Sequence, residues 1–337
     1  MPSSSAVYGC QGTTLVREER DFFRDCVPFG FILFARNCEN PAQLRVLCED
    51  LRDAAGSDVP ILIDQEGGRV ARLKPPHWRA RPPARRFGEL FEANPQSGRE
   101  AAYLCARAIA HELKDIGVNV NCAPVLDVPV MGAHDIIGDR AFSLDPATVI
   151  ELGRATIDGY LDGGVLPIVK HIPGHGRALA DSHLALPRVD ASLDALSSHD
   201  FVTFRSLNQA PIAMTAHVVY EAIDPHRPAT TSGKVVQTII RGEIGFDGLL
   251  MSDDLSMAAL EGPLTLRAKQ ALLAGCDVLL HCNGNAVEMR EVAQEAKPLS
   301  GRALQRSEAA LAHLRTPLDL DIEKCEVRLT EMVGTFA

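Results

Sequence analysis

Residues 147–171, ATVIELGRATIDGYLDGGVLPIVKH, contain the pattern that decides the fold: a helix-like stretch, two glycines and a short apolar stretch. Apolar residues recur three and four positions apart over 147–163, which predicts a helix. Residues 167–171 have the length of a strand and end in a lysine and a histidine. A strand that lacks regular polar alternation is typical of a parallel sheet covered by helices on both faces.

The same order of segments recurs along the chain. The predicted strands are 7–10, 30–34, 61–64, 118–124, 167–171, 212–217, 249–253 and 277–281. The predicted helices include 99–116, 147–163, 192–207, 233–244 and 264–275. This alternation predicts an α/β fold of the (β/α)8 TIM-barrel type. An open doubly wound sheet is the competing fold, but no G-x-G-x-x-G turn follows the first strand.

We expect one catalytic domain over residues 1–337, with a barrel core over about 6–299 and a C-terminal helical segment and tail over 300–337. Two connections are unusually long. Residues 73–86 (LKPPHWRARPPARR) are basic and rich in proline, and residues 173–187 follow the fifth strand. Long loops in a compact domain often carry function.

Composition excludes several classes of protein. The formal net charge is -10, whereas a nucleic-acid partner needs clustered Lys and Arg. No apolar run approaches the length of a membrane span, and the first residues, MPSSSAVYGCQG, lack the features of a secretion signal. The nine cysteines have no paired C-x-x-C spacing and are expected to be reduced thiols. We therefore expect a cytoplasmic protein with no nucleic-acid or membrane partner.

Ionisable or amide side chains stand at or just after the ends of six predicted strands. They are Asp64, Gln65, Glu66, Asp127, Lys170, His171, His217, Asp253, Asp254 and His281. Buried charges need partners, and a barrel active site forms at the carboxyl ends of the strands. We expect these residues to form one site.

The segment KHIPGHGRALADSH, residues 170–183, contains a candidate acid/base pair. Asp181 precedes His183 by two residues and is placed to orient its imidazole, which leaves the other ring nitrogen free for proton transfer. A lone histidine would more often be an ordinary hydrogen-bonded loop residue. The surrounding cluster of ionisable groups favours the catalytic interpretation.

The segment GFDGLLMSDDLSM, residues 245–257, ends a strand in two carboxylates. Adjacent residues of a strand point in different directions, so only one of the two faces the barrel axis. We assign Asp253 as the nucleophile and expect Asp254 to bond to the backbone or start the next helix. The alternative is that both residues only cap a helix. An aspartate nucleophile with a separate acid/base predicts retaining glycoside hydrolysis.

At these residues the sequence strongly resembles glycoside hydrolase family 3, specifically the bacterial β-N-acetylhexosaminidases that recycle peptidoglycan in the cytoplasm. The resemblance runs from about residue 9 to residue 284. Its motifs are LFARN (33–37), IDQEGGRVARL (63–73), APVLDV (123–128), IGDRAF (137–142), KHIPGHG (170–176) with DSH (181–183), and SDDLSM (252–257). Several long motifs in one order are more specific than any single pattern. Ile172 departs from the family, in which Phe is common at this position.

The resemblance implies a nucleophile at Asp253, an acid/base at His183 and an orienting residue at Asp181. Its sugar-binding residues fall on Asp64, Arg72, Arg140, Lys170 and His171, with Asp127 and His217 as supporting residues. The implied reaction removes a terminal β-linked N-acetylglucosamine from an anhydro-N-acetylmuramoyl sugar or muropeptide. No metal or cofactor is needed in this scheme, and we expect a monomer.

Other interpretations stay open. Within the family, phosphate could replace water as the acceptor, or β-glucosides or chitin fragments could be the substrates. A metal-dependent hydrolase would use His171, His175, Asp181 and His183 as ligands. A Schiff-base aldolase would use Lys170. A barrel that binds sugar without catalysis would have no use for Asp253.

Overall fold

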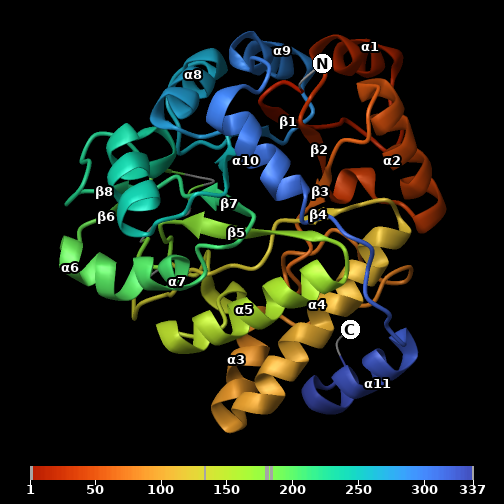
Figure 1. Cartoon of the computed structure of the whole chain (residues 1–337), viewed down its shortest axis with the longest axis vertical. Helices are drawn as coiled ribbons and strands as arrows, with labels where there is room; N and C mark the ends of the chain where they lie inside the picture. The colour runs from red at the N-terminus through yellow and green to blue at the C-terminus, as the bar shows by residue number, and fades with distance from the viewer. Residues whose placement is uncertain (1–2, 133, 179–181, 183–184, 336–337) are drawn as a thin grey trace.

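Eight parallel strands form a closed barrel in the computed structural model, which describes residues 3–132, 134–178, 182 and 185–335 (Figure 1). Each barrel strand pairs with the next one along the chain, and β10 closes the ring by pairing with β1. The strands are β1 (Ala6–Gly9), β2 (Gly30–Leu33), β3 (Ile61–Ile63), β4 (Val120–Asn121), β5 (Leu166–Ile172), β7 (Ile212–Thr215), β9 (Leu249–Asp254) and β10 (Val278–His281). The predicted (β/α)8 barrel is confirmed, and each predicted strand overlaps an observed one.

Helices surround the barrel (Figure 1). They are α1 (Arg17–Cys26), α2 (Pro41–Ala55), α3 (Ala84–Ala93), α4 (Pro95–Asp115), α5 (Pro146–Asp162), α6 (Leu193–Ala195), the π-helical turn η3 (Leu196–Asp200), α7 (Phe201–Ser206), the π-helix η5 (Val235–Glu243), α8 (Leu264–Ala274), α9 (Ala286–Glu295), α10 (Gly301–Leu311) and α11 (Ile322–Val333), with short 3-10 turns η1 (Ala35–Asn37), η2 (Gly138–Arg140) and η4 (Ala229–Thr231). The helix predicted over 192–207 is three consecutive pieces. The second sheet, β6 (Arg188–Val189) with β8 (Val219–Tyr220), was not predicted because two-residue strands show no periodicity.

The starts of the long helices follow from local chemistry. In α2, α4 and α5 a proline occupies the first turn, preceded by Asn40, Asn94 and Asp145 respectively. Each of these caps accepts a hydrogen bond from a backbone N–H of the first turn. Such groups have no partner within a helix, and proline lacks an N–H that would need one.

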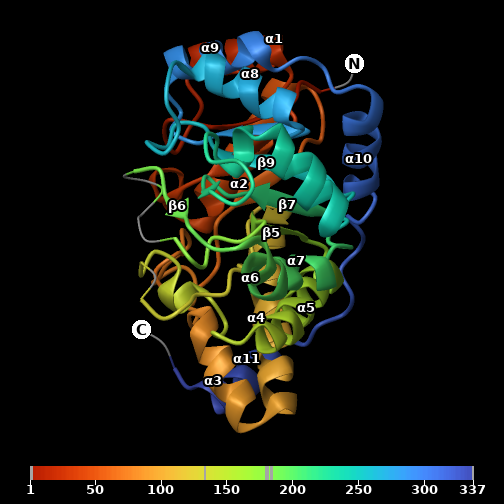
Figure 2. The ribbon, with the colours of Figure 1, turned by 90° about the vertical axis from the view of Figure 1, so that its left-hand side faces the viewer.

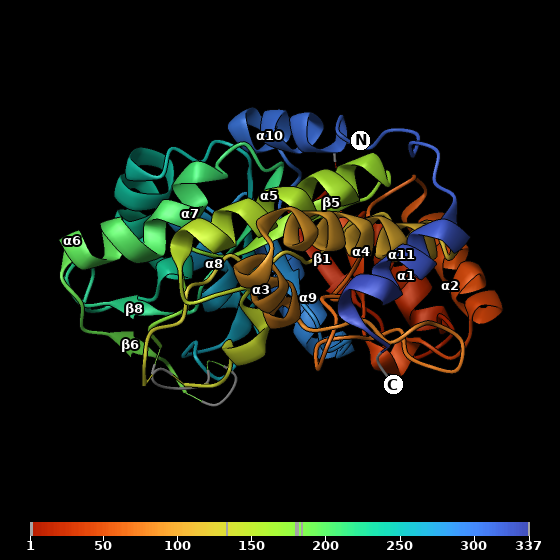
Figure 3. The same ribbon diagram turned by 90° about the horizontal axis from the view of Figure 1, so that it is seen from below.

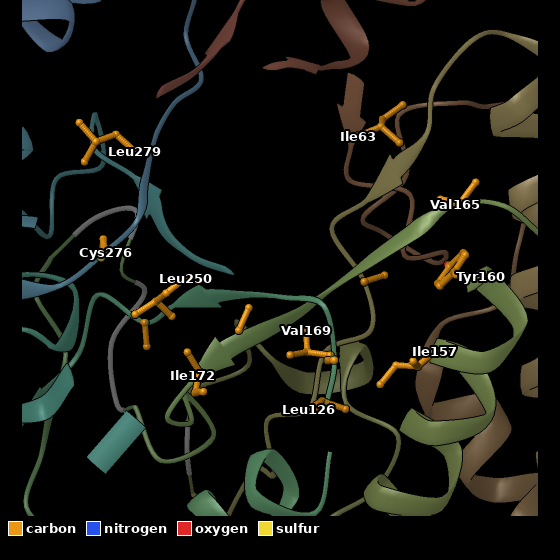
Figure 4. Close-up of a cluster of buried hydrophobic side chains, with 14 of the residues drawn as sticks. Ile63, Leu126, Ile157, Tyr160, Val165, Val169, Ile172, Leu250, Cys276 and Leu279 are labelled. Carbon is orange, nitrogen blue, oxygen red and sulfur yellow. The ribbon is translucent and has the colours of Figure 1, made fainter. Parts of the chain in front are cut away.

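Apolar side chains fill both sides of the barrel wall. One cluster lies inside the barrel and takes at least one side chain from each strand, among them Val7, Ile32, Leu62, Val120, Ile168, Met214, Met251 and Leu280. The larger cluster lies between strands and helices, where Ile157 and Tyr160 of α5 approach Val165 and Val169 at β5 (Figure 4). Successive strand residues alternate between these two environments, which explains the continuous apolar runs.

The two ends of the barrel differ. Helix α10 lies at one end, where Leu299 and Ala310 join the interior cluster, and the β6–β8 sheet lies at the other (Figures 2 and 3). Helix α11 packs beside α4, and its Glu326 accepts two hydrogen bonds from the buried Arg81 at 3.0 and 2.8 Å. None of the helices in the described part of the chain has the length and hydrophobicity of a membrane span.

The cysteines are free thiols, as predicted. All nine lie among the described residues, and seven of them are buried: Cys10, Cys48, Cys105, Cys122, Cys276, Cys282 and Cys325. Burial raises the pKa of most of these thiols, Cys105 for example to about 12, so they are not thiolates at neutral pH.

Candidate active site

A pocket of about 400 Å³ opens where the carboxyl ends of the strands meet. Six of the eight predicted site residues line it: Asp64, Arg72, Arg140, Lys170, His171 and Asp253. The other two, Asp181 and His183, lie outside the described residues. Ser182, which stands between them in the chain, does line the pocket.

Strand alternation explains why these side chains converge. Asp64, Lys170 and Asp253 each stand two positions after a residue of the interior cluster, namely Leu62, Ile168 and Met251. Side chains two apart on a strand point to the same face. The barrel interior is therefore apolar along most of its length and becomes charged at the end that forms the pocket.

A chain of alternating charges lines one wall. Arg72 Nη2 lies 3.2 Å from Asp64 Oδ2, and Lys170 Nζ donates to Asp64 Oδ1 at 2.8 Å. The same ammonium lies 2.6 Å from Glu66 Oε1. Arg140 donates to Glu66 through both Nε and Nη2, at 2.9 and 2.8 Å. Five side chains from three segments, namely the loop after β3, strand β5 and the turn η2, are thus held in one network.

The pairing keeps Asp64, Glu66 and Lys170 charged at neutral pH. Burial by itself would raise the pKa of Asp64, but Lys170 and Arg72 outweigh this effect and hold it below its ordinary value. Burial likewise opposes ionisation of Glu66, but Arg140 and Lys170 outweigh this effect and hold its pKa well below the ordinary value. Burial would lower the pKa of Lys170, but the two carboxylates raise it. Mutual pairing is what allows these charges to be buried.

The Asp127 carboxylate forms hydrogen bonds with two histidines, His171 and His175. This fully buried carboxylate lies 2.6 Å from His171 Nδ1 and accepts the backbone N–H of His175 at 2.7 Å. A carboxylate at Nδ1 keeps that nitrogen protonated and aims the ring. Burial opposes ionisation of Asp127, but His171 and the other donors keep its pKa below the ordinary value. Burial lowers the pKa of His175 to about 4, so this ring is neutral.

The two consecutive aspartates of β9 both line the pocket, but they make different hydrogen bonds. Asp253 lines the pocket, and its Oδ1 accepts the N–H of Asp254 at 2.8 Å. Asp254 bonds to the backbone N–H of Ser256 and Cys282, at 3.0 and 3.2 Å. The carbonyl oxygen of Asp254 lies 3.0 Å from Nε2 of the buried His217. His217 therefore contacts the backbone at the end of β9 and does not line the pocket.

His281 is a strand-end residue that does not join the site, and Gln65, Asp127 and His217 do not line the pocket either. His281 is fully buried, but its Nε2 lies 3.1 Å from Glu288 of α9. Its neighbours Leu280 and Cys282 belong to the interior cluster, so alternation turns His281 outward. The expectation that every strand-end group joins one site was wrong for this residue.

The metal-dependent alternative requires a cluster of metal ligands. Among the described residues, no group of three or more His, Cys, Asp or Glu side chains is arranged to hold a metal ion. His171 and His175, two of the four ligands of the metal-dependent alternative, have ring centroids 5.6 Å apart. The other two, Asp181 and His183, lie outside the described residues.

Phe34 and Arg69 line the pocket but were not candidates from the sequence, and Glu66, which also lines it, was expected at the site without a specific role. Phe34 follows Ile32 by two positions, and Glu66 follows Asp64 by two, so the alternation that places Asp64 could have identified both. The Phe34 ring lies near two guanidiniums, with Arg36 and Arg72 at 5.0 and 5.1 Å from its centroid. Arg69 stands on the loop after β3 and has no periodic pattern to mark it.

Comparison with known proteins identifies the family to which the chain belongs. Residues 15–316 match the N-terminal domain model of glycosyl hydrolase family 3. A β-hexosaminidase of Alkalilimnicola ehrlichii is 42% identical over 279 residues, covering 82% of this chain and 79% of the relative.

Solved structures agree. NagZ of Neisseria gonorrhoeae in complex with N-trifluoroacetyl-D-glucosamine is 31% identical, with a TM-score of 0.83 and 99% of each chain covered. A family 3 β-N-acetylglucosaminidase of Paenibacillus is 29% identical with a TM-score of 0.85, covering 98% of this chain and 67% of that one. The chain therefore belongs to glycosyl hydrolase family 3 and is a glycoside hydrolase.

Proposed function

We propose that the chain is a retaining β-N-acetylhexosaminidase that releases terminal β-linked N-acetylglucosamine from anhydro-muropeptides and similar peptidoglycan fragments. The observation that carries this proposal is the Asp253 carboxylate, which lies in the pocket and forms no salt bridge with another described residue. Within the described part of the chain it accepts one hydrogen bond, from the N–H of Asp254.

The environment of Asp253 suits a nucleophile. Burial would raise its pKa, but His217, His171 and the Asp254 N–H keep it below the ordinary value. Asp253 is therefore ionised at neutral pH, with one oxygen held by the backbone. In the proposed first step a carboxylate oxygen attacks the anomeric carbon, and the bond from that carbon to the leaving oxygen breaks.

His183 is the proposed acid/base, oriented by Asp181. Protonated His183 gives its proton to the leaving oxygen in the first step. The neutral ring then takes a proton from water, whose oxygen attacks the anomeric carbon and releases the Asp253 carboxylate. Ser182, the residue between this pair in the chain, lines the pocket and lies 3.3 Å from His175 Nε2, which supports the assignment.

The remaining residues are proposed to bind the sugar. The Lys170 ammonium has three N–H groups, and the described residues Asp64 and Glu66 take two of them, which leaves one for a sugar hydroxyl. Each Asp64 oxygen has one cation partner and keeps a lone pair for a sugar hydroxyl. Arg72 and His171 complete the set. The sugar analogue bound by the Neisseria enzyme supports a sugar of the same class here.

We also propose that residues 1–337 form one catalytic domain. Its support is the packing of both C-terminal helices on the barrel: α10 at the end away from the pocket, and α11 against α4.

Trapping the glycosyl-enzyme tests the mechanism. Intact protein would be incubated with a 5-fluoro-N-acetylglucosaminyl fluoride, analysed by mass spectrometry and mapped by peptides. We expect one glycosyl adduct on Asp253, and none in the Asp253→Ala variant. An adduct elsewhere, or turnover of an aryl N-acetylglucosaminide by Asp253→Ala at the wild-type rate, would exclude this nucleophile.

Turnover assays identify the acceptor and the substrate. Turnover with and without inorganic phosphate separates hydrolysis from phosphorolysis, because only phosphorolysis yields a sugar 1-phosphate. Purified anhydro-muropeptides, chitin oligosaccharides and aryl β-glucosides would be compared by kcat/KM. A preference for either of the last two would contradict the proposed substrate.

A further inference from the structure

The Glu66 carboxylate lies in the pocket wall, yet its oxygens are committed to protein donors. Oε1 accepts from Lys170 Nζ at 2.6 Å and from Arg140 Nη2 at 2.8 Å, and Oε2 accepts from Arg140 Nε at 2.9 Å. Its side chain is only 7% exposed. We infer that Glu66 is a positioning residue that aims Arg140 and Lys170 at the sugar, so that recognition of individual sugar hydroxyls depends on it. This inference rests on the proposed function.

Arg140 depends on Glu66 for its orientation. It stands at the end of η2, in the loop between β4 and α5, and its Nη1 donates to Ile136 O of the same loop at 3.2 Å. Among the described residues, Glu66 is its acidic partner from another segment. A two-pronged contact fixes the plane of a guanidinium as well as its position.

A second contact holds the backbone of the same loop. Arg69, three residues after Glu66, lies 2.9 Å from Asp139 and donates to the carbonyl oxygens of Ile136 and Ile137 at 3.0 and 3.1 Å. The loop after β3 therefore contacts the loop that carries Arg140 through two residues. Arg69 holds the backbone, and Glu66 orients the side chain that faces the pocket.

The hydrogen-bond inventory shows what remains for a ligand. Among the described residues, Glu66 and Ile136 use three of the five N–H groups of Arg140, which leaves two, and Lys170 has one left. Glu66 also neutralises two neighbouring cations, because Arg140 by itself disfavours the charged form of Lys170. Without that carboxylate the two cations repel each other and lose their common alignment.

The test compares Glu66→Gln with Glu326→Gln. Glu326 forms an equally buried two-pronged pair with Arg81 at 3.0 and 2.8 Å, away from the pocket, so it controls for loss of a buried ion pair. For each variant, kcat/KM is measured for an aryl N-acetylglucosaminide and for its 3-, 4- and 6-deoxy analogues. The crystal structure of each variant reports the position of the arginine.

We expect Glu66→Gln to lower kcat/KM for the parent substrate by about tenfold or more and to reduce the discrimination against at least one deoxy analogue. Glu326→Gln should lower Tm and leave the discrimination unchanged. Glu66→Asp, which keeps the charge but shortens the side chain, should show a weaker form of the same loss. Wild-type discrimination in a folded Glu66 variant, or an equal loss in Glu326→Gln, overturns the inference.

Failure of the proposed function can be distinguished from failure of the inference about Glu66. If the wild-type enzyme turned over no N-acetylglucosaminide, the function would be wrong, and the variant structures would decide about Glu66. An Arg140 guanidinium that stays in its wild-type position in Glu66→Gln overturns the inference, whereas a displaced one supports it.

Discussion

The substitution Asp127→Asn replaces one oxygen of a buried carboxylate with an amide nitrogen. We expect it to weaken sugar binding by changing which ring nitrogen of His171 carries the proton. In the wild-type protein Oδ2 lies 2.6 Å from His171 Nδ1, while Oδ1 accepts the backbone N–H groups of His171 and His175 at 3.2 and 2.7 Å. An asparagine keeps an oxygen for the two backbone donors. It places an amide N–H opposite Nδ1, so the imidazole must turn Nδ1 into an acceptor and carry its proton on Nε2.

Two magnitudes follow from this change. The variant loses one charge-assisted hydrogen bond, which lowers the free energy of unfolding by about 1.5–3 kcal/mol. It also reverses the hydrogen-bonding character of His171 Nε2, and loss of a group that orients a functional histidine typically lowers activity by about 10–100-fold. We expect kcat/KM for an aryl N-acetylglucosaminide to fall within that range.

Asp277→Asn is the matched control. Asp277 is also buried and accepts from three donors, Arg241 Nη2 at 2.8 Å, Leu250 N at 2.9 Å and Arg306 Nη1 at 3.1 Å, but it precedes β10 at the opposite end of the barrel. Urea unfolding and steady-state kinetics would be measured for both variants. Asp127→Asn with wild-type kcat/KM, or equal kinetic losses in both, would refute the reasoning.

Two other substitutions test the packing around the pocket. Burial lowers the pKa of His175 to about 4, against an ordinary value of 6.5, so below pH 6.5 the unfolded chain binds more protons than the fold. The wild-type protein should therefore lose about 2 kcal/mol of stability at this site between pH 7 and pH 5; urea unfolding of His175→Gln should show a correspondingly smaller loss, and an identical pH dependence would contradict the burial argument. A methyl group added at Gly88 of α3 would overlap the carbonyl oxygen of Phe142, so Gly88→Ala should lower the free energy of unfolding by about 1–3 kcal/mol, whereas Gly12→Ala, with open space around it, should leave thermal melting unchanged.

The barrel could be predicted because its pattern is local. Strands such as residues 166–172 and 249–254 are short apolar runs, and the helices between them repeat their apolar positions every three or four residues. The two-residue strands β6 and β8 escaped prediction because they are too short to show a period.

The site was predictable in part. Asp64, Lys170 and Asp253 stand where strands end, and parallel strands bring their carboxyl ends together. The same argument failed for His281, because the phase of alternation along β10 turns that side chain toward α9. A polar residue at a strand end marks a candidate, but its orientation depends on which of its neighbours face the interior.

The amino-acid sequence by itself determined the order of strands and helices and the end of the barrel that carries the chemistry. It also identified most of the charged residues of the pocket, because periodicity and strand ends are properties of neighbouring residues. Only the tertiary structure decided which charged side chains pair with one another. Arg140 and Glu66 are 74 positions apart, and Asp127 and His171 are 44 apart. Contacts of this kind exist only after the barrel closes, since closure and loop packing, rather than local pattern, set which charges meet at hydrogen-bonding distance.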